Sequence, residues 1–266
     1  MKPFHEALII RIRGTDIEET EDLVAAESGF TLLVNDRQVV TLLCTPADLD
    51  AMAIGFLLSE GILKKRDSYL GLQVNQKEYT VAVSLADLPE DLDAAFHKKT
   101  ITSGCGRGIT FSDVASLKDL PPNRSGTRIS PDRIRALLEE FRSVSVLFRQ
   151  TGGVHSAALA DGEGIHLFAE DIGRHNAVDK LIGKAFLQNI PVHDKILLSS
   201  GRISGEIMTK VIRNRIPILV SRAAPTCMSI TNAEDHGVTL VGFARGNRLN
   251  IYTHPQRIDF GKGTAA

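Results

Sequence analysis

Short apolar segments alternate with helical segments through the second half of this 266-residue chain. Two apolar stretches at 154–160 and 165–169 flank the turn DGEG and are expected to pair as a hairpin. Six more elements follow in strict alternation: helix 174–188, strand 194–199, helix 203–213, strand 216–221, helix 225–234 and strand 237–243. Strands that alternate with helices in this way form a parallel or mixed sheet covered on both faces. The fold class predicted for this half is α/β.

The first part of the chain has a different pattern. Asn35 and Asp36 lie between two apolar runs and suit a tight hairpin turn, whereas the acidic stretch 16–27 is expected to be partly exposed. An apolar helix is predicted to begin at Thr45, as its capping residue, and to stop at Gly61. Four strands are expected in this part, at 6–13, 31–34, 39–44 and 79–85.

The two patterns predict two domains. A small α+β domain is expected over residues 1–120, and a larger α/β domain over 130–266. The stretch 119–130, which is rich in proline, glycine and serine, is expected to be a linker or crossing loop. Ser130 and Pro131 then open a predicted helix that runs to about Phe148.

Composition excludes several classes of protein. The net charge is −1, so no global field draws the chain to nucleic acid or to a membrane surface. No apolar run reaches the ~20 residues of a membrane span. Three cysteines, an odd and sparse set, indicate free thiols in a reducing compartment, and we expect a cytoplasmic protein.

Two turns between a strand and a helix carry the same dipeptide. Gly173 and Arg174, followed by His175, precede one predicted helix, and Gly201 and Arg202 precede the next. Helix starts offer free N–H groups, and arginine adds a two-pronged donor for phosphate oxygens. We expect the two turns to frame one anion site, because ligands of open α/β sheets bind beyond the carboxyl ends of strands. The alternative is that the glycines make the turns and the arginines are simply solvated.

The same turns raise the question of zinc chemistry. Zinc deaminases carry H-x-E at one helix start and P-C-x-x-C at a later one. Here Ala177 stands where the proton-shuttling glutamate would be, and the second turn has no cysteine. We therefore expect no zinc and no zinc-dependent hydrolysis. His155, at the start of a predicted strand, is interpreted as a structural residue.

The three cysteines have different surroundings. Cys105 lies in the stretch TSGCGRG, with three glycines around it and Arg107 two residues away, which suits an accessible thiol with a lowered pKa. Cys44 ends an apolar strand and is expected in the core. Cys227 begins a predicted helix, and its neighbours Met228 and Ile230 favour a packed side chain over a reactive one.

Six motifs in a fixed order give the chain a family resemblance: TSGCG, TGGVHSAAL, EDIGRHNAVDKLIG, SSGRISGEIM, SRAAPT and FARGNR. Together they resemble the formate dehydrogenase accessory sulfurtransferases, the FdhD/NarQ family, over about residues 10–258. The resemblance implies a cytidine-deaminase-like three-layer sandwich for the larger domain. It also implies that sulfur is taken from a cysteine desulfurase and passed to the molybdenum cofactor bis-molybdopterin guanine dinucleotide, which then serves formate dehydrogenase.

Carried over by position, the resemblance makes Cys105 the residue that holds a persulfide. It assigns FARGNR to cofactor binding, that is Phe243, Ala244, Arg245, Gly246, Asn247 and Arg248. The pyrophosphates of the guanine dinucleotide suit the two Gly-Arg turns, and we expect a homodimer. Many members have C-x-x-C in the loop, but the fourth position here is Gly108, which excludes a relay between two cysteines of this loop.

Two other functions stay open at this point. The chain could bind the cofactor as a chaperone without transferring sulfur, in which case Cys105 would be dispensable. A redox-sensing thiol protein is the second alternative, and it predicts no nucleotide site.

Overall fold

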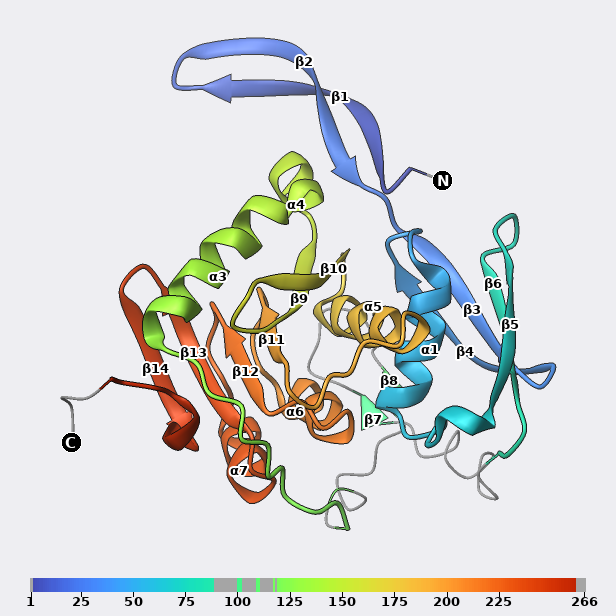
Figure 1. Ribbon diagram of the computed structural model, residues 1–266. Helices are drawn as coiled ribbons and strands as arrows, with labels where there is room; N and C mark the ends of the chain where they lie inside the picture. Colours follow the sequence, from blue (N-terminus) through green and yellow to red (C-terminus); the bar gives the residue numbers. More distant parts are fainter. Residues whose placement is uncertain (1, 89–99, 102–108, 111–116, 118, 262–266) are drawn as a thin grey trace.

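The computed structural model describes residues 2–88, 100–101, 109–110, 117 and 119–261. Its largest sheet has the strand order β10-β9-β11-β12-β13-β14 (Figure 1). The middle strands β11, β12 and β13 are parallel, and the outer pairs are antiparallel. The strands are β9 (His155–Ala160), β10 (Ile165–Asp171), β11 (Ile196–Ser199), β12 (Ile218–Ser221), β13 (Thr239–Arg245) and β14 (Arg248–Thr253). The predicted mixed sheet is confirmed, and β14 extends it beyond the predicted elements.

Helices cover both faces of this sheet. On one face, Ala157 and Leu159 of β9 belong to the same buried cluster as residues of α5 (Arg174–Leu187), α6 (Gly205–Arg213) and α7 (Cys227–Asp235). On the other face, Ala158 and Ala160 pack with α3 (Pro131–Val144). Alternate residues of one strand thus point to opposite helical layers, as strand geometry requires. The described structure is a mixed α/β fold with three layers here, and the specific likeness to cytidine deaminases stays a prediction.

The helix predicted over 130–148 is divided in two. Ser130 caps α3 by accepting a hydrogen bond from the Arg133 N–H, as expected. The chain leaves helical geometry at Ser145, whose hydroxyl donates to the Phe141 carbonyl. A second short helix, α4 (Val146–Thr151), then leads into β9.

The N-terminal part forms a four-stranded sheet of order β4-β3-β6-β5 with α1 (Leu49–Ser59) packed on it. The strands are β3 (Ser28–Val34), β4 (Arg37–Cys44), β5 (Tyr69–Asn75) and β6 (Thr80–Leu85). Asn35 and Asp36 join β3 to β4 with φ angles of 47° and 64°, which confirms the predicted turn. β5 was not predicted. A short 3-10 turn, Arg66–Ser68, precedes β5, and another, Pro255–Arg257, follows β14.

The predicted start of α1 is wrong. Asp48, not Thr45, is the N-cap residue, and it has a left-handed backbone and no side-chain capping bond. Thr45 instead uses its polar atoms on the larger sheet: its N–H donates to Asp171, and its hydroxyl accepts from the Ile172 N–H. A contact between residues far apart in sequence has replaced the local cap. The predicted stop holds, since Gly61 follows the helix with φ of 73°.

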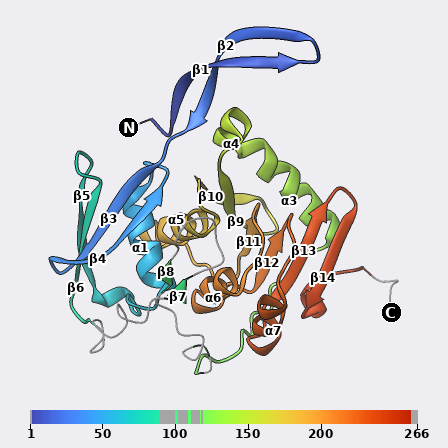
Figure 2. The same cartoon turned by 180° about the vertical axis from the view of Figure 1, so that it is seen from behind.

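Helices α1 and α5 cross at very short range, which joins the two sheets (Figures 1 and 2). A Cβ atom on Gly55 would lie 1.7 Å from the carbonyl oxygen of Asp179, and one on Gly183 would lie 1.9 Å from that of Ala51. Only glycine fits at either position. Lys210 adds a buried ion pair with Asp179 at 2.9 Å and a second with Glu60 at 3.5 Å. The division into domains at 1–120 and 130–266 stays a prediction.

Two hairpins lie outside these sheets. β1 (Phe4–Arg13) pairs with β2 (Asp16–Ala25), so the acidic stretch is largely a strand. β7 (Thr100–Ile101) pairs with β8 (Ile109–Thr110). The chain between β7 and β8, with Cys105, lies outside the described residues. No helix in the described ranges is long and apolar enough to cross a membrane.

Candidate functional site

The edge of the large sheet at which β10, β11, β12 and β13 end gathers most of the predicted site residues. We call it the strand-end edge. β9 starts there, because His155 pairs with Asp171, the last residue of β10. The chain leaves β10 through Gly173 to α5, and it leaves β11 through Gly201 to α6.

The two Gly-Arg turns lie against each other. A Cβ atom on Gly201 would be 2.9 Å from the Cβ of Arg174, so the second turn packs directly on the first arginine. Arg174 is buried, with 8% of its surface exposed, whereas Arg202 is exposed. The structure thus brings together two turns that are 28 positions apart and gives their arginines different environments.

Asp171 holds the start of α5 in place. One carboxylate oxygen accepts from the Gly173 N–H at 2.8 Å and from the Asn176 amide at 2.9 Å. The other accepts from the Thr45 N–H at 3.0 Å and pairs with the ammonium of Lys180 at 2.7 Å. Asp171 and Lys180 are both fully buried. This network fixes where the free N–H groups of α5 point.

His155 lies at the beginning of β9. Its Nδ1 is 3.3 Å from the hydroxyl oxygen of Ser200, which also accepts from the Ser156 N–H at 2.9 Å. Burial lowers the pKa of His155, and its electrostatic interactions with Arg174 and His175 lower it further, against the opposite effect of Asp171. The ring is therefore neutral at pH 7 and contributes hydrogen bonds to the edge rather than charge.

His175 has a partner that the sequence analysis missed. Its Nε2 is 2.9 Å from a carboxylate oxygen of Glu206, in the first turn of α6, and 3.4 Å from the hydroxyl of Ser204. The only sequence signal for Glu206 was its position next to the start of α6. No group of three or more His, Cys, Asp or Glu side chains in the described ranges is placed to hold a metal ion. The expectation of no zinc stays a prediction.

The segment FARGNR is the turn between β13 and β14, with Gly246 and Asn247 at its tip. The N–H of Phe243 donates to the Ala223 carbonyl at 3.1 Å, so the segment is tied to the chain that follows β12. Ala244 is buried, whereas Arg245 and Arg248 are exposed. The guanidinium of Arg248 lies 4.7 Å from the centre of the Phe243 ring.

A further arginine lies between the predicted groups. Arg222 directly follows β12, is exposed, and donates its N–H to the Ser199 carbonyl at 3.3 Å. Its own carbonyl accepts from the side chain of Arg245 at 2.8 Å. Because β11, β12 and β13 are neighbours about 5 Å apart, Arg222 continues the basic edge from Arg202 to Arg245. Its position after a strand, in the motif SRAAPT, was the available signal.

The described cysteines differ from the predictions in one case. Cys44 is buried, and burial raises the pKa of its thiol to about 12, with a smaller contribution from Asp171. Its predicted role in the core is confirmed. Cys227 is exposed at the first position of α7, and Met228 beside it is 57% exposed. The prediction that Cys227 packs inside is wrong, because the first two residues of α7, Cys227 and Met228, face outward. Cys105 and Arg107 lie outside the described residues.

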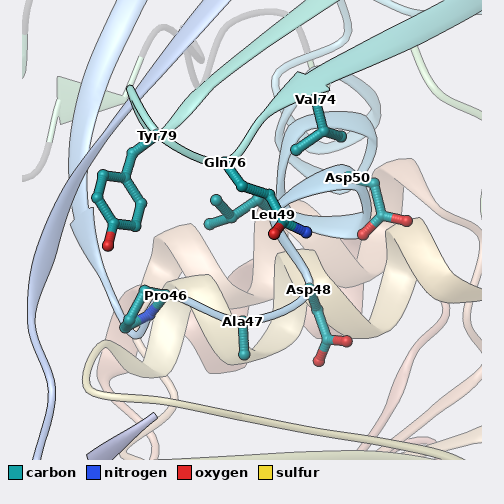
Figure 3. Close-up of a pocket in the computed structure, with 8 residues that line it drawn as sticks. All are labelled: Pro46, Ala47, Asp48, Leu49, Asp50, Val74, Gln76 and Tyr79. Atoms are coloured by element: carbon teal, nitrogen blue, oxygen red, sulfur yellow. The ribbon is translucent and has the colours of Figure 1, made fainter. Parts of the chain in front are cut away.

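A cavity of about 360 Å³ lies elsewhere, where α1 begins (Figure 3). None of the predicted site residues lines it. Its lining residues are Pro46, Ala47, Asp48, Leu49, Asp50, Val74, Gln76 and Tyr79. Two of these are carboxylates and none is a cation, so this cavity does not suit an anionic ligand.

The fold and the strand-end edge define an α/β protein with a basic site at its strand ends. The model of the FdhD/NarQ family matches residues 25–259, and this chain belongs to that family. The sulfur carrier protein FdhD of Halalkalibacterium halodurans is 41% identical, covering 94% of this chain and 93% of that protein. The sulfur carrier protein FdhD of Bacillus subtilis is 38% identical, covering 93% of this chain and 95% of that protein.

A solved structure shares the fold. It is a crystal structure from Desulfotalea psychrophila that is named as a formate dehydrogenase accessory protein. Its TM-score to this chain is 0.82 at 25% identity, and the match covers 97% of this chain and all of that one. The likeness therefore extends over both sheets.

Proposed function

We propose that this protein carries sulfur as a persulfide on Cys105 and delivers it to the molybdenum cofactor that formate dehydrogenase uses. The observation that carries the proposal is the 41% identity to a sulfur carrier protein over 94% of the chain. The crystal structure that shares the fold is named for formate dehydrogenase, which supports the destination of the sulfur. The role is that of a sulfurtransferase acting as an accessory protein.

The loading step is a thiol–persulfide exchange. The Cys105 thiolate attacks the terminal sulfur of a persulfide on a cysteine desulfurase, and the S–S bond of that persulfide breaks. The desulfurase thiolate leaves, and Cys105 now carries the S–S bond. In delivery, the S–S bond breaks and its electron pair stays on Cys105 as the thiolate, so the terminal sulfur is transferred as a neutral atom and an acceptor that holds it as sulfide would supply the two electrons. Because Cys44 is buried and its pKa is about 12, Cys44 is unsuited to this chemistry.

The strand-end edge fits the anionic part of the proposed cofactor, bis-molybdopterin guanine dinucleotide. The start of α5 and the guanidinium groups of Arg174 and Arg202 would hold pyrophosphate oxygens, with His175 beside them. The segment from Phe243 to Arg248, together with Arg222, extends the site along the edge. This arrangement favours sulfur transfer over a redox sensor, which needs no basic site.

Other features of the proposal come from the sequence and from the resemblance. We place the protein in the cytoplasm as a homodimer, with a cysteine desulfurase as donor and no zinc in the site. The larger sheet with its three layers is compatible with descent from a cytidine-deaminase-like fold that has lost the metal ligands.

The direct test is mass spectrometry of the peptide that contains Cys105, after incubation with a cysteine desulfurase and cysteine. We expect a gain of one sulfur atom that dithiothreitol removes. The control is the Cys105→Ala variant, in which no other peptide should gain sulfur. Loading on Cys227 alone would contradict the assignment. No loading on any cysteine would favour the chaperone that only binds cofactor.

Replacing Arg202 by alanine is expected to weaken the binding of guanosine diphosphate. A bidentate arginine–phosphate contact contributes roughly 1.5–3 kcal/mol, which corresponds to a loss of roughly 10- to 150-fold. The loss should shrink as salt concentration rises, because Arg202 is exposed and its charge is screened. Isothermal titration calorimetry measures both effects.

The matched control for Arg202→Ala is Arg37→Ala. Arg37 is an exposed arginine at the start of β4, in the N-terminal sheet rather than at the strand-end edge. This variant should bind guanosine diphosphate as the wild type does. Equal affinity of the Arg202→Ala protein and the wild type would remove Arg202 from the site.

A further inference from the structure

The β1–β2 hairpin extends from the body as a two-stranded ribbon. Its ten residue pairs run from Phe4 opposite Ala25 to Arg13 opposite Asp16, and neither strand pairs with another described strand. Figures 1 and 2 show it projecting beyond α4 and the rest of the molecule. A two-stranded ribbon is marginally stable in water by itself. A surface that covers one of its faces would stabilise it.

One face of the ribbon is apolar and exposed. Residues directly opposite each other on antiparallel strands share a face, so Leu8, Ile10 and Ile12 lie in one row with Ile17 across from Ile12. Between 66% and 72% of the surface of each of these four residues is exposed. Aliphatic side chains that gather on a projecting element mark an interaction surface.

The charges on this face are all negative. Glu19 lies opposite Ile10, and Glu21 lies opposite Leu8. The arginines of the hairpin are on the other face, where Arg11 pairs with Glu18 and Asp22, and Arg13 with Glu18. The apolar face therefore presents a row of isoleucine and leucine beside a row of carboxylates.

The base of the hairpin lies next to the strand-end edge. β2 contacts α4, and a Cβ atom on Gly153 would be 3.1 Å from the Cβ of Ala25. Gly153 is two residues before His155, where β9 begins at that edge. At the start of α4, the N–H groups of Leu147 and Phe148 donate to Glu170, near the end of β10. A protein bound to the hairpin would thus lie beside the basic site.

We infer that the apolar face of the β1–β2 hairpin docks the formate dehydrogenase apoenzyme, through a surface of apolar side chains flanked by lysine or arginine. The proposed function supplies the identity of this partner, since the enzyme that takes up the cofactor must approach the edge that holds it. A second copy of this chain is the poorer occupant, because two such faces packed together would bring Glu19 and Glu21 toward like charges without a cation. A partner surface with an apolar centre and a cationic rim would contact the isoleucine and leucine row with its centre and the carboxylate row with its rim.

The test measures the affinity of purified formate dehydrogenase apoenzyme from the same organism for the full-length protein, by biolayer interferometry without cofactor. Ile10→Ser combined with Ile12→Ser is expected to weaken binding by at least roughly tenfold, because truncating central apolar contacts has effects of this size. Glu19→Lys combined with Glu21→Lys should also weaken binding and reduce its dependence on salt. The second variant changes only exposed residues, so the fold is expected to persist.

The matched control compares two single substitutions, Glu21→Lys on the apolar face and Asp16→Lys on the other face. Both alter an exposed acid of β2, but Asp16 lies opposite Arg13, on the other face. Only Glu21→Lys should weaken apoenzyme binding. Three results would overturn the inference: no binding by the wild type, equal effects of the two single changes, or loss of self-association in the Ile10/Ile12 variant with apoenzyme binding intact. Persulfide loading of Cys105 and binding of guanosine diphosphate are measured separately, so a failure of the proposed function is distinguishable from a failure of this docking surface.

Discussion

Replacing Lys180 by methionine is expected to lower the free energy of unfolding by about 3–5 kcal/mol, the usual effect of breaking a buried ion pair. Lys180 and Asp171 are fully buried and 2.7 Å apart. The ammonium also donates to the Thr45 carbonyl at 2.9 Å, so it ties the N-terminal part to the turn that opens α5. Methionine has a similar volume and leaves the carboxylate buried without its cation. Urea unfolding followed by circular dichroism measures the change, since the chain has no tryptophan.

Two comparisons make this prediction specific. Lys184→Met removes a half-buried lysine of the same helix, which pairs with Asp48 at 2.8 Å, and should lower stability by only about 0–1 kcal/mol. Adding Asp171→Asn to Lys180→Met should recover part of the loss, because the uncompensated charge is gone. If the double variant were less stable than Lys180→Met, the lost hydrogen bonds of Asp171, rather than its buried charge, would dominate the network.

Sequence periodicity predicted an element correctly where the residues that start and end that element lie within it or next to it. The elements between Val154 and Phe243 alternate clearly because β11 and β12 are short apolar strands buried along their whole length, and the helices that follow them begin at the capping residues Ser204 and Thr226. Asn35 and Asp36 adopt the left-handed backbone that a two-residue hairpin turn requires, so that turn was local information. These parts of the fold could be predicted from the sequence.

Features that depend on contacts between residues far apart in the sequence could not be predicted from periodicity and local motifs. Thr45 was a sound capping candidate, but Asp171, 126 positions away, offers it a buried carboxylate instead. The close approach of Gly55 to Asp179 has no signal in either segment alone. The sequence analysis describes β2 only as an acidic stretch. Its many carboxylates interrupt the alternation of apolar residues that is typical of a strand, so its pairing with β1 was not predicted.

The residues of the candidate site also divide into those that sequence motifs predicted and those that only the structure revealed. The strand–helix turns at Arg174 and Arg202 were visible as motifs, and the structure packs one against the other. Arg222 and Glu206 also lie in quoted motifs, but nothing in the sequence singled out these two side chains, so they were found only once neighbouring strands and helices had been placed. Burial was misjudged at Cys227, because the identity of neighbouring residues does not say which side of a helix faces out.

The exposure of Cys227 makes it the strongest internal rival to Cys105, and a pair of variants separates the two. Cys105→Ala is expected to reduce formate dehydrogenase activity to background in cells that depend on this protein, since the thiol proposed to carry the sulfur is then missing. Cys227→Ala should retain most of the activity, although a thiol at a helix start is a plausible nucleophile. Cys44 supplies no alternative, because its pKa of about 12 keeps it protonated at pH 7.

The activity measurement needs a second readout, because a damaged fold would also give no activity. Cys105→Ala should bind guanosine diphosphate as the wild type does, since Cys105 is not among the residues proposed to hold the nucleotide. Retained activity in Cys105→Ala together with lost activity in Cys227→Ala would move the persulfide to the start of α7. Retained activity in both variants would mean that the protein supports formate dehydrogenase without carrying sulfur on either thiol, and the cofactor-binding chaperone would then account for the basic edge.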